Sequence, residues 1–136
     1  MAVVVGVPPL FDLIDEKFHV AGKRVLFSWG PGTIYNPGGK PIPPELVAHE
    51  QAHGARQTDA AKAIEAWWRK YIEDAEFRLH EEILGHRAEY ADFCRRNKDR
   101  NARVFALQRM AARLASPLYL EMVSIGMARD AIAGMA

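Results

Sequence analysis

The sequence predicts a mainly helical α+β fold, with a small β element near the N-terminus. Two short runs rich in strand-forming residues, at 24–30 and 33–36, are each followed by a Pro/Gly segment that continues neither a strand nor a helix. From Pro44 onward the sequence contains little that would break a helix. With 136 residues, 49% of them hydrophobic and 26% charged, the chain suits a single domain, 1–136, with a modest core.

The N-terminal part, residues 1–43, is expected to hold one short helix and the β element. Large apolar residues recur at helical spacing over 9–19: Leu10, Leu13, Ile14 and Phe18. The two strand-forming runs that follow could pair as a hairpin or as the edge of a small sheet. The first eleven residues have no basic start, and glycine and proline interrupt their apolar run. They are therefore neither a signal peptide nor a membrane span.

The helical part divides into two groups. Residues 44–98 are expected to supply the helices of a metal site, and residues 99–136 a C-terminal helical pair. Helices are predicted over four stretches: 44–57, 60–96, 101–114 and 116–133. No internal repeat and no low-complexity segment interrupts them.

The predicted helix starts carry residues that suit this position. In "PPE" at 43–45, proline costs no hydrogen bond and the acid meets the positive end of the helix dipole. Thr58 or Asp59 could cap the second helix. "SP" at 116–117 could cap and open the last one.

Charge and cysteine content narrow the classes of function. A net charge of +1 is too small to indicate binding to nucleic acid or to a membrane. The basic stretch at 95–103, with Arg109 and Arg113 beyond it, is interpreted as a solvated helix face rather than a phosphate-binding patch. The single cysteine, Cys94, excludes an intramolecular disulfide and a multi-cysteine zinc site.

The segment "AHEQAHG" places two histidines four residues apart around a glutamate. On a helix, positions i and i+4 lie on the same face, so His49 and His53 can direct both imidazoles at one zinc ion. Glu50 follows the first histidine, where its carboxylate can reach a metal-bound water without binding the metal. Small and apolar neighbours suit a buried helix, in which these polar groups would be costly without partners. The pattern therefore predicts a metal site.

A zinc hydrolase needs a third protein ligand and one open position for water. The HxxGxxH extension of the motif is absent, so the third ligand must come from another helix. The segment 77–90, "FRLHEEILGHRAEY", is the natural source, because Arg78, Glu82 and His86 recur there at four-residue intervals and share a face. Other downstream candidates are His80, Glu81, Glu89 and Asp92.

The order of these groups resembles that of gluzincin-like zinc peptidases, in which a glutamate ligand on a second helix lies three residues before a small residue. "EILG" has this pattern, which selects Glu82 over Glu81 and puts Gly85 in the small position. Glycine and histidine at 85 and 86 replace the alanine and tyrosine that we would expect there. Glu81 and His86 therefore stay alternative ligands.

Most of the chain also resembles a group of small metallopeptidases encoded in bacteriophage and prophage genomes. Four stretches between residues 33 and 124 carry this resemblance: "TIYNPGG", "LVAHEQAHGARQ", "WWRKYIEDAEFRLHEEILGH" and "LASPLYLEMVS". It implies a helical, zincin-like minimal domain that binds Zn²⁺ through His49, His53 and Glu82. The implied location is the host cytoplasm or the virion.

The implied reaction is hydrolysis of a peptide bond in a peptide or protein substrate. Zinc would lower the pKa of its bound water toward neutrality, and Glu50 would take the proton and later deliver it to the leaving amine. Further side chains could stabilise the oxyanion or orient the ligands: Tyr90, His86, Tyr71 and Arg78. In peptidases of this type an edge strand pairs with the extended substrate, which assigns a substrate-binding role to Thr33, Ile34 and Tyr35. The aromatic residues Trp67, Trp68 and Phe77 are interpreted as core.

A phage virion or assembly component of the head, neck or tail is a second class of function. In such a protein zinc would pin two helices together, and the partners would be other phage structural proteins. The fourth coordination position separates the two classes. Water with Glu50 in reach favours an enzyme, whereas a fourth side chain such as His86 favours a structural role. If the arginine stretch bound nucleic acid, the affinity would depend steeply on salt concentration. We rank this third function below the other two.

Overall fold

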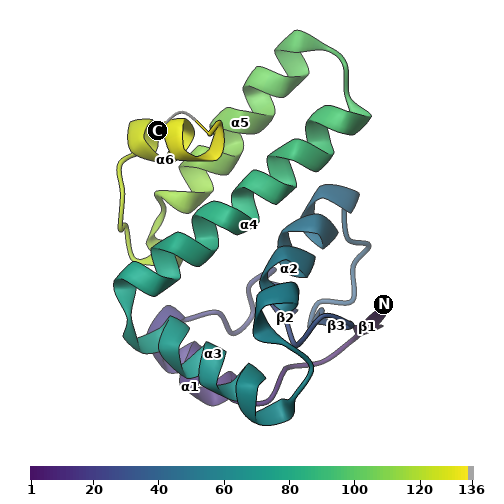
Figure 1. Ribbon diagram of the computed structural model, residues 1–136, viewed down its shortest axis with the longest axis vertical. Coiled ribbons are helices and arrows are strands. Elements are labelled where there is room, and N and C mark those ends of the chain that lie inside the picture. The colour runs from purple at the N-terminus through teal and green to yellow at the C-terminus, as the bar shows by residue number, and fades with distance from the viewer. Residues whose placement is uncertain (135–136) are drawn as a thin grey trace.

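Six α-helices and a three-stranded sheet make up residues 1–134, the part of the chain that the computed structural model describes (Figure 1). The mainly helical α+β class is confirmed. In chain order the elements are β1 (Ala2–Val4), α1 (Phe11–Phe18), β2 (Phe27–Ser28), β3 (Thr33–Tyr35), α2 (Pro44–Gln57), α3 (Ala61–Glu73), α4 (Ala75–Arg96), α5 (Arg100–Leu114), the 3₁₀ turn η1 (Pro117–Tyr119) and α6 (Ile125–Ile132). Within the described range, no helix has the length and apolar character needed to cross a membrane.

The sheet is mixed, and β3 is its central strand. The predicted pairing of the two strand-forming runs is confirmed, because β2 lies antiparallel to β3. The parallel strand β1 was not expected: all three of its side chains are exposed, so it lacks the apolar–polar alternation that marks a half-buried strand. Because both sides of β3 are paired, the expectation that a substrate strand adds to Thr33, Ile34 and Tyr35 is wrong.

Aromatic residues dominate a first hydrophobic cluster, which α1, β2 and α3 build. Trp67 and Tyr71 stack with ring centroids 5.1 Å apart, and Phe77 packs against the cluster from the start of α4. The interpretation of Trp67, Trp68 and Phe77 as core is thus confirmed. The buried members are Ile14, Phe18, Val20, Phe27, Ile64, Trp67, Trp68 and Tyr71.

A second hydrophobic cluster joins α5 and α6 to the outer side of α4. Its buried members are Ala106, Met110, Ala111, Leu114, Ala128 and Ile132. Tyr90 on α4 packs against this cluster. Figure 1 shows α4 and α5 as a long antiparallel pair with α6 beside them, while α2 lies on the other side of α4.

The contact between α2 and α4 is polar. Every buried residue of these two helices is charged, polar or glycine: His49, Glu50, His53, Gly54 and Gln57 on α2, and Arg78, Glu81, Glu82, Gly85, His86, Glu89 and Asp92 on α4. Burial of such groups costs free energy unless each finds a partner. The interior between the two helices is therefore built for polar interactions, and the two hydrophobic clusters lie outside it.

The glycine and glutamine near the end of α2 fix this helix against the sheet. A Cβ at Gly54 would lie 2.3 Å from the carbonyl oxygen of Gly30, so only glycine allows the turn after β2 to approach this closely. Gln57 accepts a hydrogen bond from the Gly30 amide at 2.7 Å and donates one to Ser28 Oγ at 3.0 Å. Gln57 is thus a structural anchor of α2.

The predicted helix over 60–96 is in fact two helices that meet at Asp74. The backbone of Asp74 is extended (φ −111°, ψ 107°), and its carboxylate accepts a hydrogen bond from the Phe77 amide at 3.1 Å. Asp74 is therefore the N-cap of α4, a capping signal that the prediction overlooked. The start of α3 was also misplaced, since its N-cap is Ala60 rather than Thr58 or Asp59.

The predicted final helix, 116–133, is wrong over its first half. "SP" at 116–117 opens only the single turn η1. Leu120 and Glu121 then have positive φ angles of 62° and 53°, a conformation that ends a right-handed helix. Ser124 accepts a hydrogen bond from the Met127 amide and caps the shorter helix α6.

Candidate metal centre

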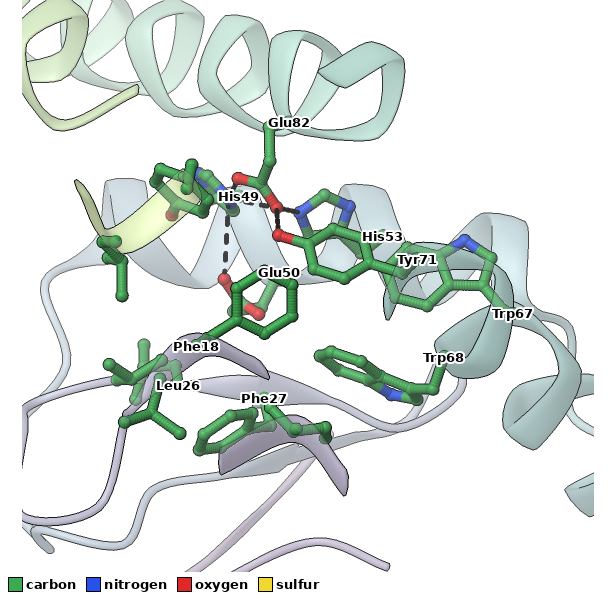
Figure 2. Close-up of a pocket in the computed structure, with 15 residues that line it drawn as sticks. Phe18, Leu26, Phe27, His49, Glu50, His53, Trp67, Trp68, Tyr71 and Glu82 are labelled. Carbon is green, nitrogen blue, oxygen red and sulfur yellow. Dashed lines mark hydrogen bonds and ion pairs between the residues drawn. The ribbon is translucent and has the colours of Figure 1, made fainter. Parts of the chain in front are cut away.

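Three side chains converge between α2 and α4. His49 and His53 face Glu82, as predicted, and these three side chains form a triangle with one side chain at each corner (Figure 2). Glu82 Oε1 is 3.2 Å from His49 Nε2, and Glu82 Oε2 is 3.1 Å from His53 Nε2. The two Nε2 atoms are 3.2 Å apart. All three residues are buried.

These separations suit a small divalent cation. In tetrahedral coordination with bonds of 2.0–2.1 Å, neighbouring donor atoms lie about 3.3–3.4 Å apart. The nearest donor atoms of each pair of side chains are 3.1–3.2 Å apart, close to that value, with Glu82 contacting His49 through Oε1 and His53 through Oε2. Two imidazole nitrogens and a carboxylate are also the donor types that zinc accepts in hydrolytic sites. The donor set therefore fits a metal ion both in kind and in spacing.

The other ring nitrogen of each histidine is held by a carboxylate. His49 Nδ1 lies 2.8 Å from Glu89 Oε1, and His53 Nδ1 lies 3.2 Å from Glu81 Oε1. An ionised carboxylate only accepts hydrogen bonds, so each Nδ1 carries the proton. In each neutral ring this leaves the lone pair on Nε2, which is directed at the space between His49, His53 and Glu82. Carboxylate partners of this kind orient metal-binding histidines in general.

Two arginines complete this outer layer. Arg113 of α5 donates to Glu89, and Arg56 at the end of α2 donates to both oxygens of Glu81 at 2.8 and 2.9 Å. Glu81, an alternative ligand in the prediction, is thus bound to His53 and Arg56 rather than directed at the triangle. Its neighbour Glu82 holds the position facing both Nε2 atoms.

The carboxylate of Glu82 is only half satisfied by hydrogen bonds. Tyr71 donates its hydroxyl to Oε2 at 2.7 Å. Oε1 is buried and, apart from the ion-pair contact with His49 Nε2, has no hydrogen-bond partner among the described residues. A buried acceptor without a donor is costly. A cation within the triangle would satisfy this oxygen.

Charge pairing governs the protonation of these groups in the metal-free state. Burial lowers the pKa of His49, but the carboxylates of Glu82 and Glu89 outweigh burial and raise it to about 10. Burial raises the pKa of Glu82, but the charges and hydrogen bonds of His53 and His49 hold it well below its ordinary value. The carboxylates thus stabilise positive charge on the histidine pair, which a bound cation would supply in place of protons.

Gly85 provides the room for this arrangement. A Cβ at this position would lie 2.8 Å from His49 Nε2 and 2.9 Å from His53 Nε2. Any other residue would therefore push on both rings. The glycine that departs from the expected alanine is required here by the close approach of α4 to the histidines.

Glu50 is placed beside the triangle and faces a cavity. Its Oε2 lies 3.7 Å from His49 Nε2, and burial raises the pKa of its carboxyl group. A cavity of about 50 Å³ lies between the triangle and the first hydrophobic cluster, and Phe18, Phe27 and Trp68 line it together with Glu50 (Figure 2). This volume is sufficient for water. Glu50 can thus contact a water next to the three donors without itself closing the triangle.

The other predicted site residues fall into different places. His86 is buried beside the triangle, but its Nδ1 bonds the Glu82 carbonyl oxygen at 2.6 Å and its Nε2 faces Arg113. Arg78 donates to the backbone carbonyl of Tyr71 at 2.9 Å and so fixes the corner between α3 and α4. Tyr90 lies in the second hydrophobic cluster and does not line the cavity.

Tyr119 was missed by the sequence reasoning. It follows a proline in η1, lines the cavity with Glu50, and packs edge-on against His86 with ring centroids 5.6 Å apart. Its position depends on the chain reversal after α5, for which the sequence carries no spacing signal.

No protein-family model, curated protein or solved structure matches the chain. The residues themselves therefore carry the interpretation of this site. Two overlapping groups of buried side chains, His49 with Glu50 and His53, and His49 with Glu82 and His86, could hold a metal ion.

Proposed function

We propose that the protein is a zinc-dependent peptidase in which His49, His53 and Glu82 hold the metal and Glu50 is the general base. The observation that carries this proposal is the convergence of three buried side chains, whose nearest donor atoms lie 3.1–3.2 Å apart in each pair. The resemblance to small metallopeptidases of phages and prophages is part of the same proposal.

A bound zinc would polarise the scissile carbonyl and lower the pKa of water at its open position. The chain's own residues supply the remaining functions. Glu89 and Glu81 hold the two imidazoles in orientation through Nδ1. Tyr71 holds one oxygen of Glu82. The site thus keeps three donors in place and leaves the side that faces the cavity open.

Proton transfer is assigned to Glu50. Its carboxylate lies beside the triangle and on the cavity wall, so it can accept a proton from a water there and pass it to the leaving amine. A pKa raised by burial makes the carboxylate a better base near neutral pH. Tyr119 on the same wall is the hydroxyl group that we assign to the developing oxyanion.

The arrangement of His86 favours this function over a purely structural zinc. A structural site closes its fourth position with a side chain. Both ring nitrogens of His86 already have hydrogen-bond partners, Nδ1 the Glu82 carbonyl oxygen and Nε2 Arg113, although Nδ1 also lies 3.5 Å from Glu82 Oε1. The nearest remaining acid is Glu50, in the position expected of a base.

Substitution of Glu50 by glutamine tests the proposal. Glu50→Gln removes the base and keeps the shape, so we expect unchanged zinc content and a fall in peptide hydrolysis of about 10²–10⁴-fold. The measurement is cleavage of a mixed peptide pool, followed by mass spectrometry, with zinc content determined on the same samples. Glu45→Gln, on the same helix and outside the site, is the matched control. Equal cleavage by the Glu50 variant and the wild type would remove Glu50 from the mechanism.

A further inference from the structure

The site continues into a groove on the surface. A hollow of about 90 Å³ lies beside Glu50 and Arg113. A larger hollow of about 270 Å³ adjoins it. The two share three wall residues: Arg24, Leu26 and Leu46. A segment of chain bound at Glu50 can therefore continue into the larger hollow.

The larger hollow combines an apolar surface with two cations. Apolar side chains form most of its wall: Leu26, Pro41, Ile42, Pro43 and Leu46. Arg24 and Lys40 line it as well, and both are exposed. Asn36 donates its side-chain amide to the Lys40 carbonyl oxygen at 2.8 Å, which fixes the loop that carries this lysine.

The charged side chains that line the larger hollow are all positive. Among the described residues no acid lines the larger hollow, and neither Arg24 nor Lys40 has an ion-pair partner. Their charges are free for a ligand. An apolar surface flanked by two such cations is complementary to an apolar group with a carboxylate next to it.

We propose that this hollow selects peptide substrates in which an apolar side chain adjoins a carboxylate, which Arg24 and Lys40 bind. The inference rests on the proposed peptidase function and adds the class of substrate. The carboxylate could belong to an aspartate or glutamate side chain or to the C-terminus of the peptide. A side-chain carboxylate and a C-terminal carboxylate offer the same chemistry to the two cations, and the experiment below distinguishes them.

Binding to the zinc-loaded Glu50→Gln protein tests this without turnover. The probes are three fluorescein-labelled peptides of one length: one with an internal Leu-Asp and an amidated C-terminus, its Leu-Asn counterpart, and one that ends in leucine with a free carboxylate. We expect either carboxylate peptide to bind about tenfold more tightly than the Leu-Asn peptide. Fluorescence anisotropy gives the affinities. The tighter of the two carboxylate peptides identifies the source of the carboxylate.

Charge reversal shows whether the two cations are responsible. Arg24→Glu and Lys40→Glu should each remove most of the preference, whereas Lys23→Glu, an exposed neighbour that does not line the groove, should keep it. A carboxylate that bound zinc directly would keep its preference in all three variants and would overturn the proposal. Equal affinity for all three peptides, or no binding, would also overturn it.

Cleavage of the same peptides by the wild-type protein separates the two proposals. Cleavage without preference for a carboxylate would remove the substrate assignment and keep the peptidase. Carboxylate-dependent binding without cleavage would remove the peptidase function and keep the binding groove.

Discussion

At the scale of single residues, the two histidines are held from both ends. Each Nδ1 contacts a carboxylate, and each Nε2 faces the carboxylate of Glu82. Without a cation, two protonated rings whose Nε2 atoms lie 3.2 Å apart repel each other. One metal ion between them would remove this repulsion and would bind the Glu82 carboxylate that faces both rings.

The carboxylates behind the histidines should therefore tune zinc affinity without binding the metal. We expect Glu81→Gln and Glu89→Gln each to weaken zinc binding by about 10–100-fold, because the imidazoles lose orientation and basicity. Competition with a chromophoric chelator measures the affinity. The exposed Glu76→Gln on the same helix is the control. Unchanged affinity in both buried variants would mean that these carboxylates only stabilise the fold.

The residues at the triangle could be predicted from the sequence, and those around it could not. Helical spacing puts His49 and His53 on one face, and the resemblance selects Glu82 over Glu81. Glu89 on α4 and Arg113 on α5, which pair with each other, are 24 positions apart in the sequence. Nothing in local spacing encodes such a contact, because it depends on how α5 packs along α4.

At the scale of elements, the polar face of α4 controls how closely this helix approaches α2. The helix turns its apolar side chains toward α5 and α6, and its acids, histidine and glycine toward the metal centre. Gly85 lies at the closest approach to both imidazoles.

Replacement of Gly85 by alanine should affect helix stability and zinc affinity in opposite directions. In a helix interior alanine is more favourable than glycine by about 1 kcal/mol. In Gly85→Ala the new Cβ would meet two ring nitrogens at under 3 Å, so we expect the zinc affinity to fall by at least about tenfold. Zinc titration together with thermal unfolding of the metal-free protein measures both effects. Gly126→Ala on α6, where a Cβ meets nothing within 4 Å, is the matched control, and equal zinc affinity in the two variants would contradict the packing argument.

Element boundaries were predicted well where composition changes sharply. The Pro/Gly segment before residue 44 marks the start of α2 correctly. The break at Asp74 was missed because residues on both sides favour helix and only one capping residue marks the corner. Strand β1 was missed because its stability comes from pairing with β3, which is distant in sequence.

At the scale of the whole molecule, two hydrophobic clusters flank a polar interior. The first lies among α1, β2 and α3, and the second among α4, α5 and α6. Between them α2 and α4 meet through histidines, acids and glycines. The apolar pattern predicts the mainly helical class, but only the folded arrangement shows that the candidate metal site lies between the two clusters.

Metal removal should accordingly destabilise the entire fold. Zinc present at about a thousandfold excess over its Kd would stabilise the native state by about 4 kcal/mol. For a chain of this size we expect chelation to lower Tm by roughly 10 °C or more. Scanning calorimetry with and without a chelator measures the shift, and re-addition of zinc should restore it. A Tm that does not respond to the chelator in a zinc-loaded sample would show that the polar interior is stable without a metal.

A zinc titration of the wild type and of Glu82→Ala tests the central claim, convergence of two helices on one cation, most directly. We expect one zinc per wild-type chain and a loss of at least about a thousandfold in affinity in the variant, since the α4 carboxylate that faces both imidazoles is removed. Calorimetry gives both the stoichiometry and the affinity. A wild-type chain that binds no zinc, or a variant that binds it equally well, would contradict the metal centre described here.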